Sequence, residues 1–278
     1  MATTSVTVCD VGPRDGLQNE PEVLSPGVRA ELVNRLVPAG LPEVEVASFV
    51  DPRRVPQMGG AEEVVGAVER RPGVVFSGLA LNERGYERLA AAGLDEVRFA
   101  FGATESFNRT NQNASVEESL AAAERIVARA REDGIKATVN ISVAFGCPFE
   151  GRVEEDHVLE LAERVAGTRP ALILLADTIG VGVPGDVRRL VSRTVELGIP
   201  VGGHFHNTRN TGYANALAAL EAGATLLDAS VERLDMDNVH KVFSDVVKTW
   251  FESHLRRNRD LLIRHLKKNY ERVETYNQ

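Results

Sequence analysis

The chain has 278 residues, a formal net charge of −8 and two cysteines. The negative charge disfavours a nucleic acid or an anionic membrane surface as the main partner. Two cysteines exclude a disulfide framework and a cysteine-rich zinc site. The N-terminal sequence MATTSVTV lacks the basic and apolar regions of a secretory signal, and no apolar run approaches the roughly 18 residues of a membrane span. We therefore expect a cytoplasmic protein.

Short runs of β-branched residues alternate with longer segments whose apolar residues recur every three or four positions. The expected strands are 5–11, 43–50, 73–81, 96–102, 136–145, 171–178, 199–206 and 224–231. The expected helices are 27–39, 60–70, 83–92, 115–133, 153–166, 184–197 and 210–222. Ser115 and Glu118 form a capping-box pattern, and Gly134 and Gly223 stand where helices should end.

Eight strands that alternate with helices predict a (β/α)8 TIM barrel over residues 1–231. A doubly wound open sheet is the rival architecture, and it is disfavoured because no GxGxxG motif follows the first strand. Residues 232–278 have a different composition, with no alanine, glycine or proline. Their apolar stripes predict two helices, the first of which would be the eighth helix of the barrel, and the change in composition suggests a segment of different origin.

Polar residues gather at the expected strand ends, where a barrel of this type carries its active site. His204 and His206 lie two apart on a strand, so both point to one face and form half of a site for a divalent metal. The alternative is a surface pair without a ligand. The rest of the set is Arg14, Asp15, Gln18, Asn19, Glu45, Ser48, Asn140, Ser142, Asp177, Thr178 and Asn207.

Glu45 stands in an otherwise apolar strand. A charge inside a barrel is costly unless it is paired or bound to a metal. A structural salt bridge to an arginine is the alternative to a role in the active site.

Six stretches carry a resemblance to a known family. They are VGPRDGLQNE (11–20), EVASFVDPRRVPQM (45–58), SFNRTN (106–111), GCPFEG (146–151), ADTIGVGVPG (176–185) and HFHNTRNTGYANALAALEAGATLLDASV (204–231). Together they resemble the hydroxymethylglutaryl-CoA lyases, which are metal-dependent carbon–carbon lyases built on a barrel. The resemblance spans roughly residues 5–231. It implies an acyl-CoA substrate, 3-hydroxy-3-methylglutaryl-CoA, which is cleaved to acetyl-CoA and acetoacetate.

The resemblance also implies roles for individual residues. Asp15, His204 and His206 resemble the ligands of a divalent metal, Mg²⁺ or Mn²⁺. Arg14 resembles the arginine that neutralises the carbonyl oxygen of the substrate, and Glu45 and Asp177 resemble acids that position water or the base. Gln18, Asn19, Ser48, Asn140, Ser142 and Thr178 are expected to contact the substrate. Arg53 is expected to attract the CoA phosphates, with a solvated loop charge as the alternative. A homodimer is compatible with the family.

The chain departs from the family after Val231. There the family continues through a glycine-rich loop with a cysteine that protonates the enolate, then reaches an asparagine ligand. Here no cysteine follows Cys147, and Asn238 is the candidate for the fourth ligand, with a helix N-cap as the alternative. We therefore expect slow turnover, because a positioned acid typically contributes about 10²- to 10⁴-fold. The alternatives are a lyase or aldolase for another 3-hydroxy acid or acyl-CoA, and a catalytically silent barrel.

Overall fold

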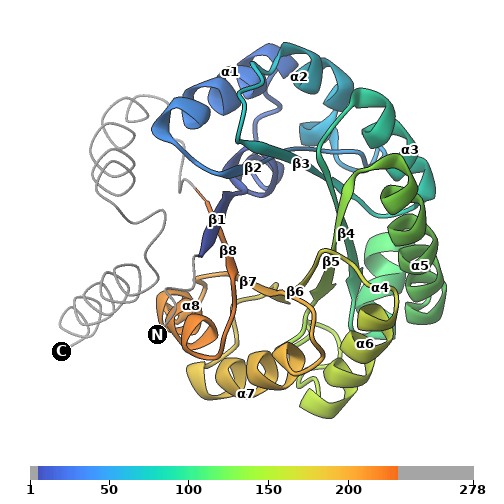
Figure 1. Ribbon diagram of the computed structural model, residues 1–278, viewed down its shortest axis with the longest axis vertical. Helices are drawn as coiled ribbons and strands as arrows, with labels where there is room; N and C mark the ends of the chain where they lie inside the picture. The colour runs from blue at the N-terminus through green and yellow to red at the C-terminus, as the bar shows by residue number, and fades with distance from the viewer. Residues whose placement is uncertain (1–5, 231–278) are drawn as a thin grey trace.

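The computed structural model describes residues 6–230, which form a closed barrel of parallel strands surrounded by helices (Figure 1). The strands follow one another around the barrel in sequence order, and β1 closes it by pairing with β8. They are β1 (Thr7–Asp10), β2 (Glu43–Ser48), β3 (Val75–Ala80), β4 (Glu96–Gly102), β5 (Lys136–Ser142), β6 (Leu172–Asp177), β7 (Val201–Phe205) and β8 (Leu226–Ala229). The predicted (β/α)8 barrel is confirmed.

Helices form the outer layer and return the chain between successive strands. They are α1 (Pro26–Leu36), α2 (Ala61–Ala67), α3 (Glu83–Ala92), α4 (Glu105–Gln112), α5 (Val116–Asp133), α6 (Glu155–Gly167), α7 (Pro184–Val195) and α8 (Gly212–Glu221). Three single turns, η1 (Gly12–Gly16), η2 (Val37–Ala39) and η3 (Pro56–Met58), complete the described elements. No helix in this part of the chain is long and apolar enough to cross a membrane.

Local signals in the sequence explain several helix ends. Ser115 and Glu118 form the predicted capping box at the start of α5, with both reciprocal hydrogen bonds present. Gly134 ends α5 at φ 72°, a left-handed conformation that glycine adopts without steric cost. Helix α4 was not predicted, because its sequence ESFNRTNQ carries few apolar residues. The two helices predicted after β8, and Asn238, lie outside the described residues.

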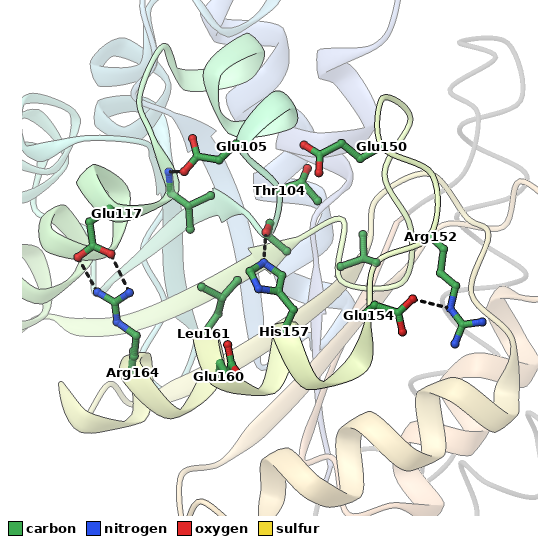
Figure 2. A pocket seen from close by; sticks show the side chains of 13 residues that line it. Thr104, Glu105, Glu117, Glu150, Arg152, Glu154, His157, Glu160, Leu161 and Arg164 are labelled. Atoms are coloured by element: carbon green, nitrogen blue, oxygen red, sulfur yellow. Dashed lines mark hydrogen bonds and ion pairs between the residues drawn. The ribbon is translucent and has the colours of Figure 1, made fainter.

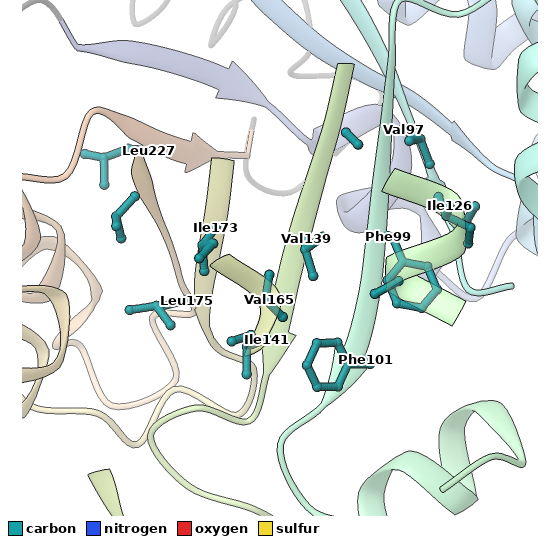
Figure 3. Close-up of a cluster of buried hydrophobic side chains, with 14 of the residues drawn as sticks. Val97, Phe99, Phe101, Ile126, Val139, Ile141, Val165, Ile173, Leu175 and Leu227 are labelled. Carbon is teal, nitrogen blue, oxygen red and sulfur yellow. The ribbon is translucent and has the colours of Figure 1, made fainter. Parts of the chain in front are cut away.

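The strands are buried on both faces, and alternate residues serve different layers. Val97, Phe99 and Phe101 of β4 belong to the main apolar core with Ile126 of α5, and Val139 of β5 joins them (Figure 3). Leu172, Leu174 and Leu226 form a separate apolar cluster.

The alternate positions of several strands carry charged or polar side chains instead. Glu43 and Glu45 of β2, Arg98 of β4 and His204 of β7 are all at most 9% exposed, and Asp228 of β8 has a side chain only 2% exposed. Ion pairs among Glu43, Arg98, Asp228 and His204, and between Glu45 and Arg14, place them inside the barrel, which is therefore filled partly by a polar network.

Candidate metal centre and active site

Asp15, His204 and His206 come together at the C-terminal ends of β1 and β7. The Nε2 atoms of the two histidines are 3.1 Å apart, and each lies 3.8 Å from Oδ2 of Asp15. One ligand atom from each residue can be chosen so that all three lie within 4.8 Å of one another. The side chains are 18%, 11% and 35% exposed in the order Asp15, His204, His206, so the site is recessed and still reachable from solvent.

The turn η1 presents Asp15. It begins directly after β1, where Val11 N–H donates to Ala229 O and the Val11 carbonyl accepts from Asp15 N–H at 2.7 Å. The carboxylate is thereby held at the mouth of the barrel beside β7. His204 lies within β7 and His206 directly follows it, so the two-residue spacing of a strand brings both rings to the same side.

The donor set fits a divalent cation. A carboxylate and two imidazoles are ligands that Mn²⁺ and similar ions accept, and two imidazole Nε2 atoms at 3.1 Å cannot both carry a proton. Burial, followed by the effect of His204, lowers the pKa of His206, which favours the neutral ring that can act as a ligand. Although burial opposes it, the cationic Arg14 and the two histidines lower the pKa of Asp15.

Arg14 lies beside this cluster and is 8% exposed. Its Nε donates to Glu45 Oε2 at 2.7 Å, and its Nη1 donates to Asp15 Oδ1 at 2.8 Å. Burial disfavours the guanidinium charge, but the Glu45 and Asp15 carboxylates outweigh burial and raise the pKa of Arg14. The salt bridge between Glu45 and an arginine, the alternative raised from sequence, is thus present, and the arginine is itself one of the predicted site residues.

Asp177 and Thr178 organise the loop after β6. The two carboxylate oxygens of Asp177 accept N–H groups of Val181 and Gly182, each at 2.9 Å. Thr178 Oγ1 accepts Val143 N–H at 2.8 Å, which ties this loop to the end of β5. Both residues therefore shape the mouth of the barrel through backbone contacts.

The other predicted site residues occupy different surroundings. Among the described residues, Ser48 Oγ, Asn140 Oδ1 and Glu45 Oε1 are buried without a hydrogen-bond partner. Ser142 ends β5 and Gln18 follows η1, and both are half-buried. Asn19 is exposed, and Asn207 Oδ1 accepts Gly212 N–H at the start of α8. Arg53 is exposed and forms an ion pair with Asp51 at 2.7 Å in the loop after β2.

A charged network behind the Asp15–His204–His206 cluster was not predicted from the sequence. Nδ1 of His204 lies 2.9 Å from Asp228 Oδ2, and Arg98 Nη1 donates to Asp228 Oδ1 at 2.7 Å. Arg98 Nη2 also donates to Glu43 Oε1 at 2.6 Å. Burial opposes ionisation of Asp228, but Arg98 and the His204 hydrogen bond lower its pKa to about 2. The signal that singled out Glu45, a charge in an apolar strand, applies equally to Glu43 and Arg98.

A cavity of about 560 Å³ lies on the flank of the barrel, between α6 and the segment from β4 to α5 (Figure 2). None of the predicted site residues lines it. Its arginines are already paired, Arg164 with Glu117 and Arg152 with Glu154. Three further glutamates at 105, 150 and 160 make the lining acidic, which disfavours the phosphates of CoA.

Comparisons with known proteins identify the family of the chain. The HMGL-like family model matches residues 5–234. The chain is 45% identical over 240 residues to (R)-citramalyl-CoA lyase of Chloroflexus aurantiacus, a match that covers 82% of this chain and 75% of that protein. It is 40% identical over 232 residues to the human cytoplasmic 3-hydroxy-3-methylglutaryl-CoA lyase, with 82% of this chain and 62% of that protein covered.

The crystal structure of hydroxymethylglutaryl-CoA lyase from Pseudomonas aeruginosa superposes with a TM-score of 0.78 at 37% identity, covering 82% of this chain and 77% of that one. The expected enzyme class, a lyase of the hydroxymethylglutaryl-CoA lyase type, is confirmed at the level of the family. The chain therefore belongs to the HMGL-like family.

Proposed function

We propose that this protein is a metal-dependent carbon–carbon lyase that cleaves 3-hydroxy-3-methylglutaryl-CoA to acetyl-CoA and acetoacetate. The observation that carries the proposal is the cluster of Asp15, His204 and His206 with the Arg14 guanidinium bonded to one of its members. We assign Mg²⁺ or Mn²⁺ to the cluster. The family relationship and the similarity to acyl-CoA lyases support an acyl-CoA substrate.

A divalent metal, when bound, supplies a positive charge that lowers the pKa of a substrate hydroxyl. Arg14 contributes a fixed charge next to that position. Its bonds to Glu45 and Asp15 use Nε and Nη1, and Nη2 has no hydrogen-bond partner within residues 6–230, so we assign it to a substrate oxygen. Because the guanidinium is held before the reaction, it stabilises the negative charge that develops on the thioester oxygen without reorganisation.

We assign supporting roles to the neighbouring residues. Glu45 fixes Arg14, and its unpaired Oε1 is available to a water or to the substrate. Ser48 and Asn140 offer further polar atoms that have no partner within residues 6–230, as expected of a site that binds a polar substrate. Asp177 acts through the loop that it holds, since backbone N–H groups occupy both of its oxygens. Gln18, Asn19, Ser142, Thr178 and Arg53 remain proposed substrate contacts.

A second candidate substrate is (R)-citramalyl-CoA, because the chain is 45% identical to a lyase of that name. Both compounds carry a hydroxyl and a methyl group on the carbon that is cleaved from the acetyl-CoA unit. They differ by one methylene between that carbon and the distal carboxylate. The same metal cluster and the same arginine serve either cleavage, so the distal carboxylate decides which substrate is used.

We propose that this chain differs from relatives with a cysteine in the loop after β8 in the source of the proton that converts the enolate to acetyl-CoA. The two cysteines of the chain, Cys9 and Cys147, are both buried. Thr104 and the Phe149 N–H donate hydrogen bonds to the Cys147 sulfur, so this thiol is held within its own turn. We propose that solvent protonates the enolate and that turnover is about 10²- to 10⁴-fold slower than with a positioned acid.

We also propose that the protein is cytoplasmic and associates as a homodimer.

The test is a product assay with both acyl-CoA compounds, with added Mg²⁺ or Mn²⁺ and a His204→Ala control. Acetyl-CoA is the shared product, whereas acetoacetate marks cleavage of the first substrate and pyruvate marks cleavage of the second. We expect metal-dependent release of acetoacetate that the control lacks. Pyruvate release alone would transfer the assignment to citramalyl-CoA, and release of neither acid from metal-loaded protein would contradict the proposed activity.

A further inference from the structure

The charged network inside the barrel connects the metal cluster to β4, the strand opposite β8. Cys9 of β1 is in register with Glu43 on one side and with Asp228 on the other, so these two carboxylates lie at one level of the barrel. Arg98 lies on β4, which is separated from β8 by four strand steps around the closed sheet in one direction and four in the other. Its guanidinium nevertheless contacts both carboxylates, and it therefore crosses the interior.

Asp228 links Arg98 to the metal cluster, because its carboxylate contacts both Arg98 and His204. Oδ1 accepts from Arg98 Nη1 at 2.7 Å, and Oδ2 lies 2.9 Å from Nδ1 of His204. An ionised carboxylate can only accept hydrogen bonds, so the proton in the second contact lies on Nδ1. The Nε2 lone pair of His204 then points toward Asp15 and His206, which is the orientation that a metal ligand requires.

We propose that Arg98 is a positioning residue for the metal centre, acting through Asp228 on the orientation of His204. The inference rests on the proposed metal site. Arg98 reaches neither the carboxylate nor the imidazole nitrogens of the ligand cluster directly: its two terminal nitrogens are used by Asp228 and Glu43. The side chain is 3% exposed, so solvent does not screen the interaction.

A purely structural role is the competing explanation, since Arg98 also neutralises buried acids. Truncation of Arg98 would then lower stability and leave metal affinity unchanged. Arg29 provides a matched control, because it is another buried arginine, 1% exposed, whose Nη1 donates to the carbonyl of Gly59 from α1 in the outer layer. Its truncation removes a buried guanidinium without touching the interior network.

The experiment measures Mn²⁺ affinity of the full chain by calorimetry or by electron paramagnetic resonance, with no substrate present. We expect Arg98→Met and Asp228→Asn each to weaken Mn²⁺ binding by about 10- to 100-fold, the range found when the residue behind a metal ligand is lost. Arg29→Met should bind as the wild type does. Arg98→Lys, which keeps a charged donor toward Asp228, should recover part of the affinity.

The double variant Arg98→Met/Asp228→Asn separates the two explanations. If Arg98 acts through Asp228, the double variant binds Mn²⁺ no more weakly than Asp228→Asn alone. Wild-type affinity in folded Arg98→Met, or losses that multiply in the double variant, would overturn the inference. Should Arg98→Met fail to fold, wild-type affinity in Asp228→Asn would overturn it. A wild-type chain that binds no Mn²⁺ would contradict the metal centre itself and this inference with it.

Discussion

Glu96 offers a quantitative test of the polar interior of the barrel. Its side chain is 5% exposed at the start of β4, and Oε1 has no hydrogen-bond partner among the described residues. Burial, followed by the negative charge of Glu43, raises the pKa of Glu96 to about 7, from an ordinary value of 4.5, although Arg98, Thr138 and Lys136 oppose the shift. Replacing this glutamate by glutamine should therefore change how stability depends on pH.

The sign and size of the effect follow from the shifted pKa. The folded state retains the Glu96 proton up to about pH 7, whereas the unfolded chain loses it near pH 4.5. The stabilisation is complete below pH 4.5 and is lost as the pH rises through the folded value of about 7. At about 1.4 kcal/mol for each pKa unit, ionisation of this single group lowers the free energy of unfolding by about 3 kcal/mol as the pH rises from 4.5 to about 7.

The assay is equilibrium denaturation of the wild type and Glu96→Gln in urea at several pH values from about 5 to 8. As the pH rises, the free energy of unfolding of the wild type should fall by about 3 kcal/mol relative to that of Glu96→Gln. Glu163→Gln is the control, because it removes the same charge from an exposed position of α6 and should leave the pH profile unchanged. Parallel profiles for the wild type and Glu96→Gln would refute the reasoning.

Three further predictions concern the mouth of the barrel. His206→Ala should abolish measurable Mn²⁺ binding in calorimetry and leave the circular dichroism spectrum unchanged, since the ring is 35% exposed; unchanged binding would remove His206 from the site. Arg14→Met should lower the free energy of unfolding by about 3–5 kcal/mol, because Glu45 stays buried without its partner. Arg53→Met is its exposed control in the same urea titration, and equal losses in the two variants would contradict this reasoning. Asp177→Ala should lower the free energy of unfolding by about 2–6 kcal/mol, since two N–H groups lose their acceptor. A decrease below about 1 kcal/mol would show that the loop does not depend on Asp177.

The sequence was sufficient for the barrel because each strand and most helices carry a clear periodic signal. Apolar runs were enough to predict the strands, and Ser115, Glu118 and Gly134 were enough to predict the ends of α5. Helix α4 was missed because its folding depends on a tertiary contact. Asn108 in that helix is fully buried, with its amide bonded to Gly102 of β4 and to residues at the start of α5.

The metal cluster was predictable for a related reason. Asp15, His204 and His206 lie at or just after the C-terminal ends of strands that must meet at one face of the barrel, so topology alone brings them together. The partners behind them were not predicted. Arg98 and Asp228 lie 130 positions apart in the sequence, and their pairing depends on side-chain lengths across the barrel interior that strand periodicity does not specify.

The hydrogen bonds of Asp177 and Arg53 illustrate a second limit. A carboxylate at a strand end looks the same in sequence whether it faces a substrate or accepts backbone N–H groups, as Asp177 does. Likewise, the pairing of Arg53 with Asp51, two positions away, depends on the shape of the loop after β2. Local hydrogen bonding decides such cases, and only the folded loops reveal it.

We propose above all that the Asp15–His204–His206 cluster binds the metal on which cleavage depends. The most direct test titrates the chelator-treated chain with Mn²⁺ and measures bound metal and acetyl-CoA release from 3-hydroxy-3-methylglutaryl-CoA in the same samples. We predict that the rate rises in proportion to bound metal and levels off at one ion per chain, with neither binding nor release in His204→Ala. Acetyl-CoA release from the chelated protein, or from the His204→Ala variant at the wild-type rate, would contradict the account.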